Sequence, residues 1–571
     1  MRYVCLTCDF DGTLARNGRV ASGTLQALEK LRASGRKLIL ATGRELDDLL
    51  TVFPDVSLFD RAVAENGGVL YRPSSKQRVL LAEPPPRKFI DELSRRGVQP
   101  LSVGQCVVAT WHPNESIVLD VIRAMSLELQ IIFNKNAVMI LPSGVNKGTG
   151  LQIALNELQL SHHNVVGVGD AENDHAFLSA CECSIAVSNA LPALKERADW
   201  VTAHSHGAGV EEAVHGLLNN DLADLAPCLK RHNILLGSLE NAEPFSLQAY
   251  GSGLLIAGPS GSGKSTVVTA VVERLVECKY QVCIFDPEGD FDEFEQTMSI
   301  GGPEHVPKTS EILEILSNPS RSLNINLLGV PLADCPLFFQ TALARIQELR
   351  FKTGHPHWVV IHEAHHVLPV ELAKAGITVP QDIKSFLVVT VNPESVFSSI
   401  LKAVNGIITV GSEPENVIDS FNRSSGANVS AHCSGHTPQT GQVLVWCLDN
   451  QEPPKCVKVE EASTQRRRHR RKYAMGELGQ DKSFYFRGPD GKLNLRAQNM
   501  NLFAQIAEGL DEETWKFHLS SGDYSRWLRE SIKDDEIAAI VAEIEKNKDL
   551  STSESRRQVI DAIHKHYTAP A

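Results

Sequence analysis

The sequence predicts an α/β protein with two doubly wound parallel-sheet domains and a mainly helical C-terminal domain. Apolar strand-like runs alternate with amphipathic helical segments over 1–217 and again over 232–460, a pattern typical of parallel sheets covered by helices. The chain has 571 residues, more than one hydrophobic core holds, because single cores stop growing at roughly 250–300 residues. From 478 to 571 the apolar spacing becomes mainly helical.

The first predicted domain, 1–217, contains four strand-like runs that would form a buried parallel sheet. They are YVCLTCDFD, RKLILATG, HNVVGVGD and SIAVSN. An insert at about 79–143, between the second and third runs, has helical and strand-like segments of its own, and we interpret it as a small α/β cap. Because open α/β sheets bind ligands outside the carboxyl ends of their strands, we expect the site at those ends.

Polar residues at these ends suit phosphate chemistry. They are Asp9 and Asp11 in DFDGT, Thr42 in LATGR, Lys147 in NKGTGL, and Asp170 and Asp174 in GDAEND. One carboxylate can attack phosphorus and a second can move the leaving group's proton, while a divalent ion neutralises the pair. Thr42 would donate a hydrogen bond to phosphate and Lys147 would supply a fixed positive charge. Asp170 and Asp174, one helical turn apart, would lie on one face and hold Mg²⁺.

These four motifs resemble those of the haloacid dehalogenase superfamily. The cap, AENGG at 64–68 and LPSGVNKGTGL are similar to its Cof-type, subfamily IIB sugar-phosphate phosphatases. The resemblance implies that Asp9 is the nucleophile that becomes aspartyl-phosphate, that Asp11 is the general acid and base, and that Thr42 and Lys147 bind phosphate. It therefore implies hydrolysis of a small phosphorylated metabolite, such as a sugar or polyol phosphate.

The same resemblance implies a magnesium site and a substrate-selecting cap. Its Mg²⁺ would bind Asp9, the backbone carbonyl of Asp11 and Asp170, with Asp174 in support. In the cap, Trp111, His112 and Lys135 are candidates to face the pocket, although such residues more often only complete a cap surface.

A second phosphate motif, GPSGSGKST, lies at 258–266 between a predicted strand and a predicted helix. It matches G-x-x-x-x-G-K-[ST] in the context that makes the match specific. Backbone N–H groups and the helix N-terminus would hold the phosphates of ATP, Lys264 would reach the β- and γ-phosphates, and Ser265 would bind Mg²⁺. The expected nucleotide-binding residues are Gly258, Gly261, Gly263, Lys264, Ser265 and Thr266.

An acidic residue facing this loop is also required, and WVVIHEAHHVL supplies Glu363. With FDPEGDF at 285–291 and TVNPESV, this segment resembles the HerA-like ATPases, relatives of ring-forming DNA pumps. The resemblance implies that Glu363 polarises the attacking water, and it leaves a homo-oligomer through this domain open. One departure is His362, where that family has Asp. A neutral imidazole there would donate rather than accept toward metal-bound water, so the sequence favours nucleotide binding over efficient hydrolysis.

Charge and composition limit the other partners. The formal net charge of −13 and pI near 5.9 argue against a surface built to bind nucleic acid, but leave a local patch open. The run RRRHRRK in the predicted linker 461–477 is a phosphate contact or, as we favour, a solvated linker. No apolar run reaches the roughly 18–20 residues of a membrane span, and 12 scattered cysteines suit a reducing cytoplasm.

Two functions follow from these motifs. In the first, the chain is a phosphatase whose P-loop domain regulates or assembles it. In the alternative, it is a HerA-like motor or assembly ATPase with an accessory phosphatase-like domain.

Overall fold

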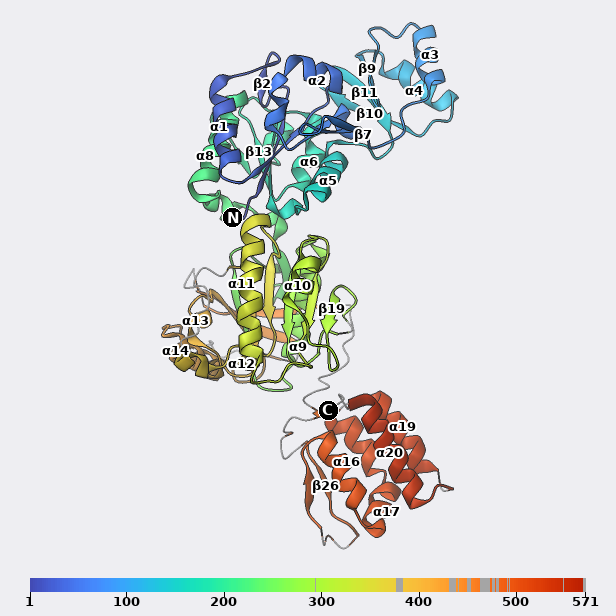
Figure 1. Ribbon diagram of the computed structural model, residues 1–571, viewed down its shortest axis with the longest axis vertical. Coiled ribbons are helices and arrows are strands. Elements are labelled where there is room, and N and C mark those ends of the chain that lie inside the picture. Colours follow the sequence, from blue (N-terminus) through green and yellow to red (C-terminus); the bar gives the residue numbers. More distant parts are fainter. Residues whose placement is uncertain are drawn as a thin grey trace.

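The structure is a computed structural model with three bodies in chain order, each with its own hydrophobic core (Figure 1). The basic run at 466–472 lies outside the residues that the structure describes. The described residues are 1–292, 294–375, 384–430, 438–439, 441–448, 453–462, 473–474, 478, 482–489, 491, 493–532, 534–547 and 549–567.

The first body is built on an eight-stranded sheet of order β14-β13-β12-β1-β4-β5-β6-β7. Its strands are β1 Cys5–Asp9, β4 Lys37–Ala41, β5 Arg61–Ala64, β6 Val69–Arg72, β7 Gln77–Leu80, β12 Val165–Gly169, β13 Cys183–Ala186 and β14 Trp200–Val201. The central strand β1 is buried throughout and pairs in parallel with β4 and β12, which explains its nearly unbroken apolar sequence. Its carboxyl end therefore opens at the middle of the sheet.

Helices cover both faces of this sheet (Figure 1). They are α1 Ser22–Ala33, α2 Leu46–Val52, α5 Lys147–Leu158, α6 His175–Ala180, α7 Pro192–Lys195 and α8 His206–Asn220. Helix α5 begins with a capping box, in which the Asn146 side chain accepts from the backbone of Thr149 and Thr149 accepts from the backbone of Asn146. This cap fixes Lys147 as the first residue of the helix.

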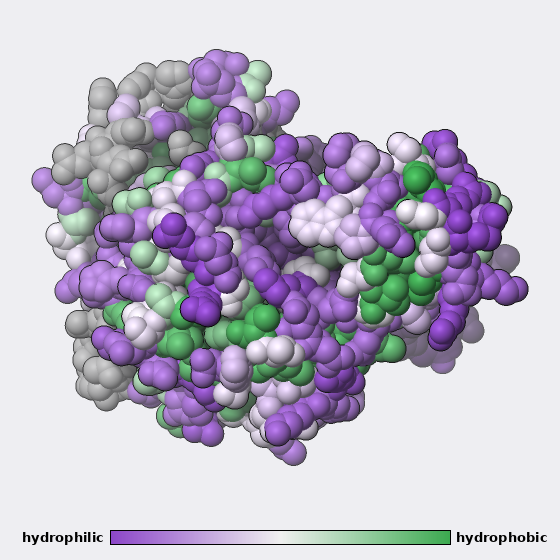
Figure 2. All heavy atoms as spheres, turned by 90° about the horizontal axis from the view of Figure 1, so that it is seen from above, coloured by the Kyte–Doolittle hydropathy of each residue, from purple (hydrophilic) through white to green (hydrophobic). Residues whose placement is uncertain are grey.

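The cap is a separate antiparallel sheet of order β10-β11-β9-β8 carrying two helices. Its elements are α3 Arg87–Arg95, β8 Ser102–Val103, β9 Val108–Trp111, α4 Glu115–Ala124, β10 Leu129–Asn134 and β11 Ala137–Pro142. Seen from the first body's end of the molecule, most of the surface is hydrophilic, while hydrophobic side chains gather on the cap at the right (Figure 2).

The second body contains an eleven-stranded sheet of order β16-β15-β25-β24-β23-β17-β22-β21-β18-β20-β19. Its strands are β15 Ile234–Leu239, β16 Pro244–Leu247, β17 Gly253–Ala257, β18 Val282–Asp286, β19 Met298–Gly301, β20 Leu323–Asn326, β21 Trp358–Ile361, β22 Phe386–Thr390, β23 Gly406–Thr409, β24 Gln442–Cys447 and β25 Lys455–Val459. Strands β19 to β23 with β17 and β18 pair in parallel, and the other pairs are antiparallel. The glycine-rich loop leaves the central strand β17.

The main helices of this body are α9 Lys264–Glu277, α10 Thr309–Leu316, α11 Cys335–Thr353 and α14 Pro414–Ser425, with short α12 Ala364–Val367 and α13 Ser398–Leu401. Helix α9 has buried residues along most of its length, and its N-terminus follows the glycine-rich loop directly.

The third body combines a hairpin, β26 Phe484–Phe486 and β27 Leu495–Ala497, with five helices among the described residues: α16 Met500–Gly509, α17 Glu512–Ser521, α18 Asp523–Trp527, α19 Asp535–Lys546 and α20 Thr552–Tyr567. Trp515, Tyr524 and Trp527 are buried in its core, and Phe517 is half-buried. In the part of the chain that the structure describes, no helix is both long and apolar enough to cross a bilayer.

Candidate functional site

Three buried carboxylates meet at the carboxyl ends of β1 and β12. Asp9, Asp170 and Asp174 each offer an oxygen atom within 4.8 Å of the other two. The ammonium of Lys147 lies between two of them, with Nζ 2.5 Å from Asp9 Oδ1 and 2.6 Å from Asp174 Oδ1. Lys147 comes from the start of helix α5, where the chain returns from the cap, and not from a strand end of the sheet. Lys147 thus links the DFDGT motif, which contains Asp9, to the GDAEND motif, which contains Asp174.

The loop after β12 places two of these carboxylates differently from the expectation that they share a helical face. Asp170 lies in the loop, and Glu172–Asp174 form a 3₁₀ turn. Asp174 Oδ2 accepts hydrogen bonds from the backbone N–H groups of Asp170, at 2.8 Å, and Ala171, at 2.9 Å. Asp174 therefore braces the loop, while Asp170 is left to face Asp9.

The three carboxylates of this cluster repel one another, and the ammonium of Lys147 attracts them. Burial and the charge of Asp174 raise the pKa of Asp9 well above its ordinary value, and burial also raises the pKa of Asp170. Burial works against the charge of Lys147, but Asp174 and Asp9 outweigh it and raise the pKa of that ammonium. Such crowding of carboxylate oxygens favours the binding of a hard divalent cation.

Asp11 and Thr42 line the open side of the site next to an arginine that the sequence reasoning did not select. Arg44 holds Asp11 with two hydrogen bonds, Nε to Oδ2 at 2.5 Å and Nη2 to Oδ1 at 2.8 Å. Thr42 Oγ1 accepts from the backbone N–H of Arg44 at 3.1 Å. The signal was present, because Arg44 ends the LATGR motif, and a bidentate arginine is a common partner of carboxylate and phosphate.

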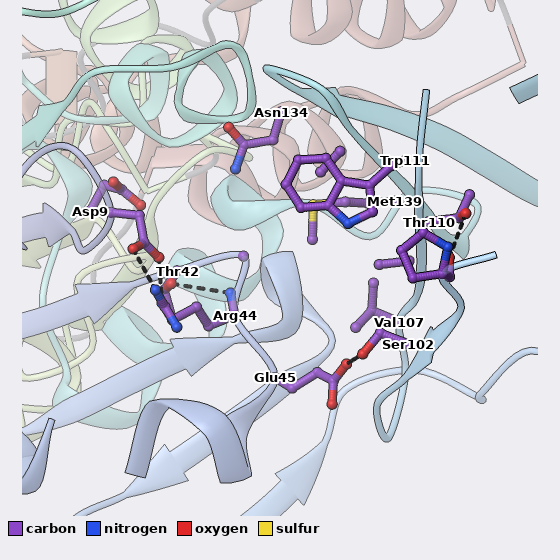
Figure 3. Close-up of a pocket in the computed structure, with 15 residues that line it drawn as sticks. Asp9, Thr42, Arg44, Glu45, Ser102, Val107, Thr110, Trp111, Asn134 and Met139 are labelled. Carbon is purple, nitrogen blue, oxygen red and sulfur yellow. Dashed lines mark hydrogen bonds and ion pairs between the residues drawn. The ribbon is translucent and has the colours of Figure 1, made fainter. Parts of the chain in front are cut away.

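A cavity of about 350 Å³ lies between the first sheet and the cap (Figure 3). Asp9 and Arg44 lie on its sheet side, and Trp111 and Met139 face them from the cap. Asp11 also lines the cavity.

Of the three cap candidates, Trp111 lines this cavity. Lys135 reaches the cluster of buried carboxylates instead, with Nζ 3.0 Å from Asp170 Oδ2. His112 pairs with Glu115 of the cap at 2.8 Å and is exposed, so it completes the cap surface. Sequence reasoning did not select Asn134 or Met139, because only the folded cap brings β10 and β11 over the sheet.

The second candidate site is the loop between β17 and α9. Gly261 and Gly263 have φ of +78° and +99°, values that side chains other than glycine rarely adopt. A Cβ atom at Gly258 would lie 2.0 Å from the carbonyl oxygen of Val410. Lys264 Nζ donates to the carbonyl of Pro259 at 3.1 Å, so the ammonium lies over its own loop. The loop therefore has the backbone shape of a phosphate cradle.

Ser265 and Thr266 are the next residues of α9 and are half-buried and exposed respectively. The third body also reaches this loop. Lys482 Nζ would lie 3.3 Å from a Cβ atom placed on Gly261. No sequence pattern links Lys482 to the loop, since the contact depends on how the third body docks.

Glu363 follows β21 in a left-handed conformation with φ of +40°. Its Oε2 is buried and has no hydrogen-bond partner within the described ranges, and His365 Nδ1 lies 3.4 Å away. Burial and the neighbouring His366 lower the pKa of His365. Strand β21 lies two strands from β17 in the parallel part of the sheet, so Glu363 and the loop follow strand ends at the same edge.

His362 lies between two carboxylates of the neighbouring strand end. Its Nδ1 is 3.6 Å from Asp286 Oδ1, and its Nε2 is 3.7 Å from Asp290 Oδ2. Burial alone would lower the pKa of His362, but Asp286 and Asp290 outweigh burial and raise it. The surroundings therefore favour the imidazolium over the neutral ring assumed from the sequence. Neither form of the ring has the carboxylate oxygen that an Asp at this position would offer to metal-bound water.

The first two bodies match two different protein families. The family described as haloacid dehalogenase-like hydrolase matches residues 6–97 and 123–214. The family described as helicase HerA, central domain, matches residues 247–350.

Two similar proteins cover the first body only. The phosphoglycolate phosphatase of Methanothermobacter thermautotrophicus is 30% identical over 215 residues, which are 37% of this chain and 96% of that protein. The phosphoglycolate phosphatase of Pyrobaculum islandicum is 31% identical over 229 residues, 39% of this chain and 98% of that protein. A solved HAD/COF-like hydrolase of Plasmodium vivax is 20% identical, with a TM-score of 0.34 over 38% of this chain and 96% of its own.

The chain is thus an α/β enzyme with two large, mainly parallel sheets, and its second body carries a P-loop domain of the HerA central type. Its first body matches these hydrolase relatives over nearly their whole length. The chain therefore belongs to the haloacid dehalogenase-like hydrolases, joined to a HerA-type P-loop domain.

Proposed function

We propose that the protein is a magnesium-dependent phosphoric monoester hydrolase that acts on a small phosphorylated metabolite at the cavity between the first sheet and its cap. One observation carries this proposal. Lys147 Nζ joins Asp9 and Asp174, and Asp170 offers an oxygen to the same cluster, so the residues that we propose as nucleophile, fixed positive charge and metal ligands lie together.

The residues fit a magnesium ion. Three buried carboxylates exceed the two ammonium groups that reach them, those of Lys147 and Lys135, by one negative charge. Mg²⁺ prefers oxygen ligands of this type and keeps several of its own waters. Asp9, Asp170 and the backbone carbonyl of Asp11 would hold it, with Asp174 in support, and the ion would offset the charge of the phosphoryl oxygens.

The chain's own residues would divide the reaction between two carboxylates. A carboxylate oxygen of Asp9 would attack phosphorus, and the bond from phosphorus to the ester oxygen would break as Asp11 gives that oxygen a proton. Water, deprotonated by Asp11, would then hydrolyse the aspartyl-phosphate and release phosphate. Arg44 holds Asp11 at the cavity wall, while Thr42 and Lys147 would hold the phosphoryl oxygens.

The substrate class follows from the cavity and from the relatives' names. A volume of about 350 Å³ admits a small metabolite. Sugar and polyol phosphates were expected from the sequence, whereas the relatives are named for phosphoglycolate, a phosphorylated acid. The guanidinium of Arg44, at the cavity wall, would also suit a substrate carboxylate. We therefore place 2-phosphoglycolate first and sugar phosphates second.

The P-loop body would bind ATP with Mg²⁺ on Ser265 and would regulate or assemble the phosphatase. The glycine conformations at the loop and the buried Glu363 support nucleotide binding. We expect this body to hydrolyse ATP as a second activity, with Glu363 polarising the water, and it could assemble the chain into a homo-oligomer. The alternative is a HerA-like motor or assembly ATPase in which the phosphatase-like body is accessory. In the described ranges all cysteines are free thiols, which supports a cytoplasmic location.

The test is phosphate release by the full chain from a panel of phosphometabolites with Mg²⁺, with and without ATP. We expect turnover of 2-phosphoglycolate or a sugar phosphate without ATP. Turnover of ATP alone, stimulated by DNA, with no phosphometabolite consumed, would favour the alternative.

A further inference from the structure

A cluster of histidines lies where the first and second bodies meet, away from both phosphate sites. His163 precedes β12, His232 ends the segment Lys230–His232 that joins the two bodies, and His357 precedes β21. The ring of His163 stacks on Tyr280 of the second body, with centroids 3.7 Å apart. The junction is therefore a built interface with polar side chains inside it.

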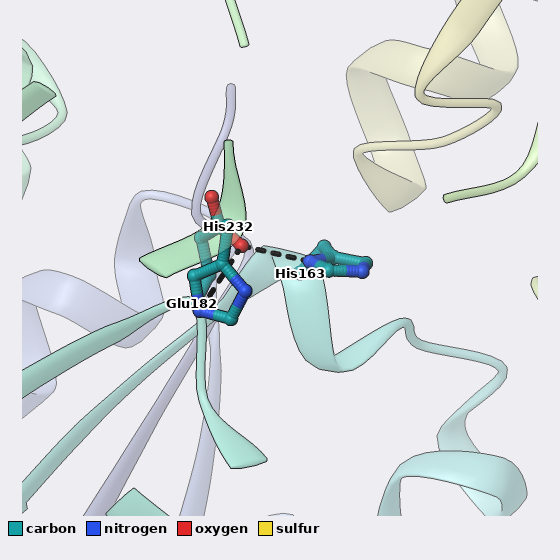
Figure 4. A group of neighbouring side chains, drawn as sticks. All are labelled: His163, Glu182 and His232. Atoms are coloured by element: carbon teal, nitrogen blue, oxygen red, sulfur yellow. Dashed lines mark hydrogen bonds and ion pairs between the residues drawn. The ribbon is translucent and has the colours of Figure 1, made fainter. Parts of the chain in front are cut away.

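Three side chains of this junction point toward one place (Figure 4). Glu182 Oε2 lies 2.7 Å from His163 Nδ1 and 3.7 Å from His232 Nε2. These three atoms all lie within 4.8 Å of one another. Glu182 and His163 are almost fully buried, and the His232 side chain is 16% exposed. Two imidazole nitrogens and one carboxylate oxygen are a common ligand set for zinc.

The other ring nitrogen of His163 determines which atom it offers. Nε2 lies 2.8 Å from the carbonyl oxygen of Cys278, the residue after helix α9. Because a carbonyl oxygen only accepts, Nε2 carries a hydrogen, and Nδ1 is the atom that faces Glu182. Nδ1 is at hydrogen-bond distance from Oε2, 2.7 Å, so a metal ion bound there would displace the proton between the two atoms. Histidines that bind metals usually donate their second N–H to a carbonyl or carboxylate in this way.

The ion pair between His163 and Glu182 does not explain the position of His232. Its Nε2 is buried and has no hydrogen-bond partner within the described part of the chain. The backbone of Cys181 hydrogen-bonds to the same ring. A buried nitrogen aimed at a carboxylate 3.7 Å away is too far for a hydrogen bond, but this spacing leaves room for a cation.

The two oxygens of Glu182 have different partners. Arg2 Nη2 binds Oε1 at 2.5 Å. Oε2 lies 2.7 Å from His163 Nδ1 and accepts from the Tyr280 hydroxyl at 3.3 Å. Arg2 thus orients the carboxylate, and an ion bound at Oε2 would take the place of its hydrogen bond with His163.

We propose that His163 Nδ1, His232 Nε2 and Glu182 Oε2 form a binding site for a divalent transition ion of the zinc class. Two imidazoles with a single carboxylate favour zinc or a similar borderline ion over magnesium, which prefers oxygen ligands. The ion would link the connecting segment to the first body, next to Cys278, the residue that follows helix α9. Because the N-terminus of α9 holds the P-loop, the ion would also fix the orientation of the nucleotide-binding body.

The test uses the full chain carrying Asp170→Asn, so that the carboxylate cluster of the phosphatase site loses a ligand. The chelator-stripped protein is titrated with Co²⁺, followed by visible absorption, and with Zn²⁺, in competition with a chromophoric chelator. His232→Gln removes one ligand at a position that the connecting segment tolerates. The matched control is His215→Gln, an exposed histidine on α8.

We expect one tightly bound ion per chain with the absorption of a nitrogen-ligated, low-coordinate Co²⁺ site, unchanged in His215→Gln. His232→Gln should weaken Zn²⁺ binding by at least about 10- to 100-fold, because loss of a residue that only hydrogen-bonds to a metal ligand already lowers metal affinity by that factor. Absence of this spectrum in the Asp170→Asn protein would overturn the proposal whatever the variants do. Equal Zn²⁺ affinity in His232→Gln and His215→Gln would also overturn it, leaving an ion pair between His163 and Glu182.

Discussion

The two phosphate sites of this chain differ in how far they are assembled before any ligand arrives. At the first, Lys147 bonds to Asp9 and Asp174, and Arg44 bonds to Asp11, so residues of several motifs already contact each other. At the second, Lys264 bonds to its own loop, and one oxygen of Glu363 is buried without a hydrogen-bond partner in the described residues.

This difference has a physical cause. The first site brings three carboxylates together, and such a cluster is tolerated only with cations built in. In the proposed function the second site receives polyphosphate, which brings negative charge with it, so this site needs no internal cluster of opposite charges. We infer that the first site is preorganised for chemistry and that the second is completed by its nucleotide.

The largest effect is expected from Asp9→Asn, which removes the nucleophile and keeps the shape of the side chain. Phosphate release from 2-phosphoglycolate should fall by at least about 10⁴-fold, the scale seen when a catalytic nucleophile is lost. Initial rates with saturating Mg²⁺ measure this, with circular dichroism to confirm folding. Retention of wild-type turnover would remove Asp9 from the mechanism.

Lys147→Met tests whether the first site is held together by its internal cation. The variant leaves Asp9 and Asp174 buried without their partner, so the first body should lose about 3–5 kcal/mol of unfolding free energy. Mg²⁺ should restore part of this loss. Calorimetry of the full chain measures the change, with Lys88→Met, an exposed lysine of α3, as the control. Equal stability of the two variants would contradict the preorganised site.

Lys264→Ala tests the second site. Loss of one charge-assisted contact should weaken ATP binding by about 1.5–3 kcal/mol, or roughly 10- to 150-fold. Lys482→Ala should have a smaller effect in the same direction, because Lys482 reaches the loop only from the third body. Fluorescent-nucleotide titration measures both. An unchanged affinity in Lys264→Ala would mean that the loop is a structural turn.

The smallest effect concerns His362, whose pKa is raised by Asp286 and Asp290 against the effect of burial. A raised pKa stabilises the fold below the ordinary value of 6.5, and this contribution disappears as pH rises through the folded value. The unfolding midpoint of the second body should therefore exceed that of His362→Asn at pH 5–6 and approach it at high pH. A constant difference across this range would show that the ring stays neutral.

Strand-end residues could be placed from the sequence, and contacts between separate segments could not. Asp9, Thr42 and Asp170 come together because the carboxyl ends of parallel strands share one edge. The pairing of Arg44 with Asp11 depends on side-chain direction in a loop, which no periodicity encodes. His362 meets Asp286 only because β21 lies beside β18 in the sheet.

The junction histidines were missed for the same reason. His163, Glu182 and His232 come from three separate segments with no metal-ligand spacing between them. Only the docking of the first two bodies brings them together.

The central claim is that the first site is complete without a nucleotide, and one rate comparison tests it most directly. Initial phosphate release from 2-phosphoglycolate and from a sugar-phosphate panel is measured with Mg²⁺ and no nucleotide, for the wild-type chain and for Lys264→Ala. The account predicts turnover of at least one substrate at equal rates in the two proteins. Turnover that requires ATP, or that is lost in Lys264→Ala, would contradict it.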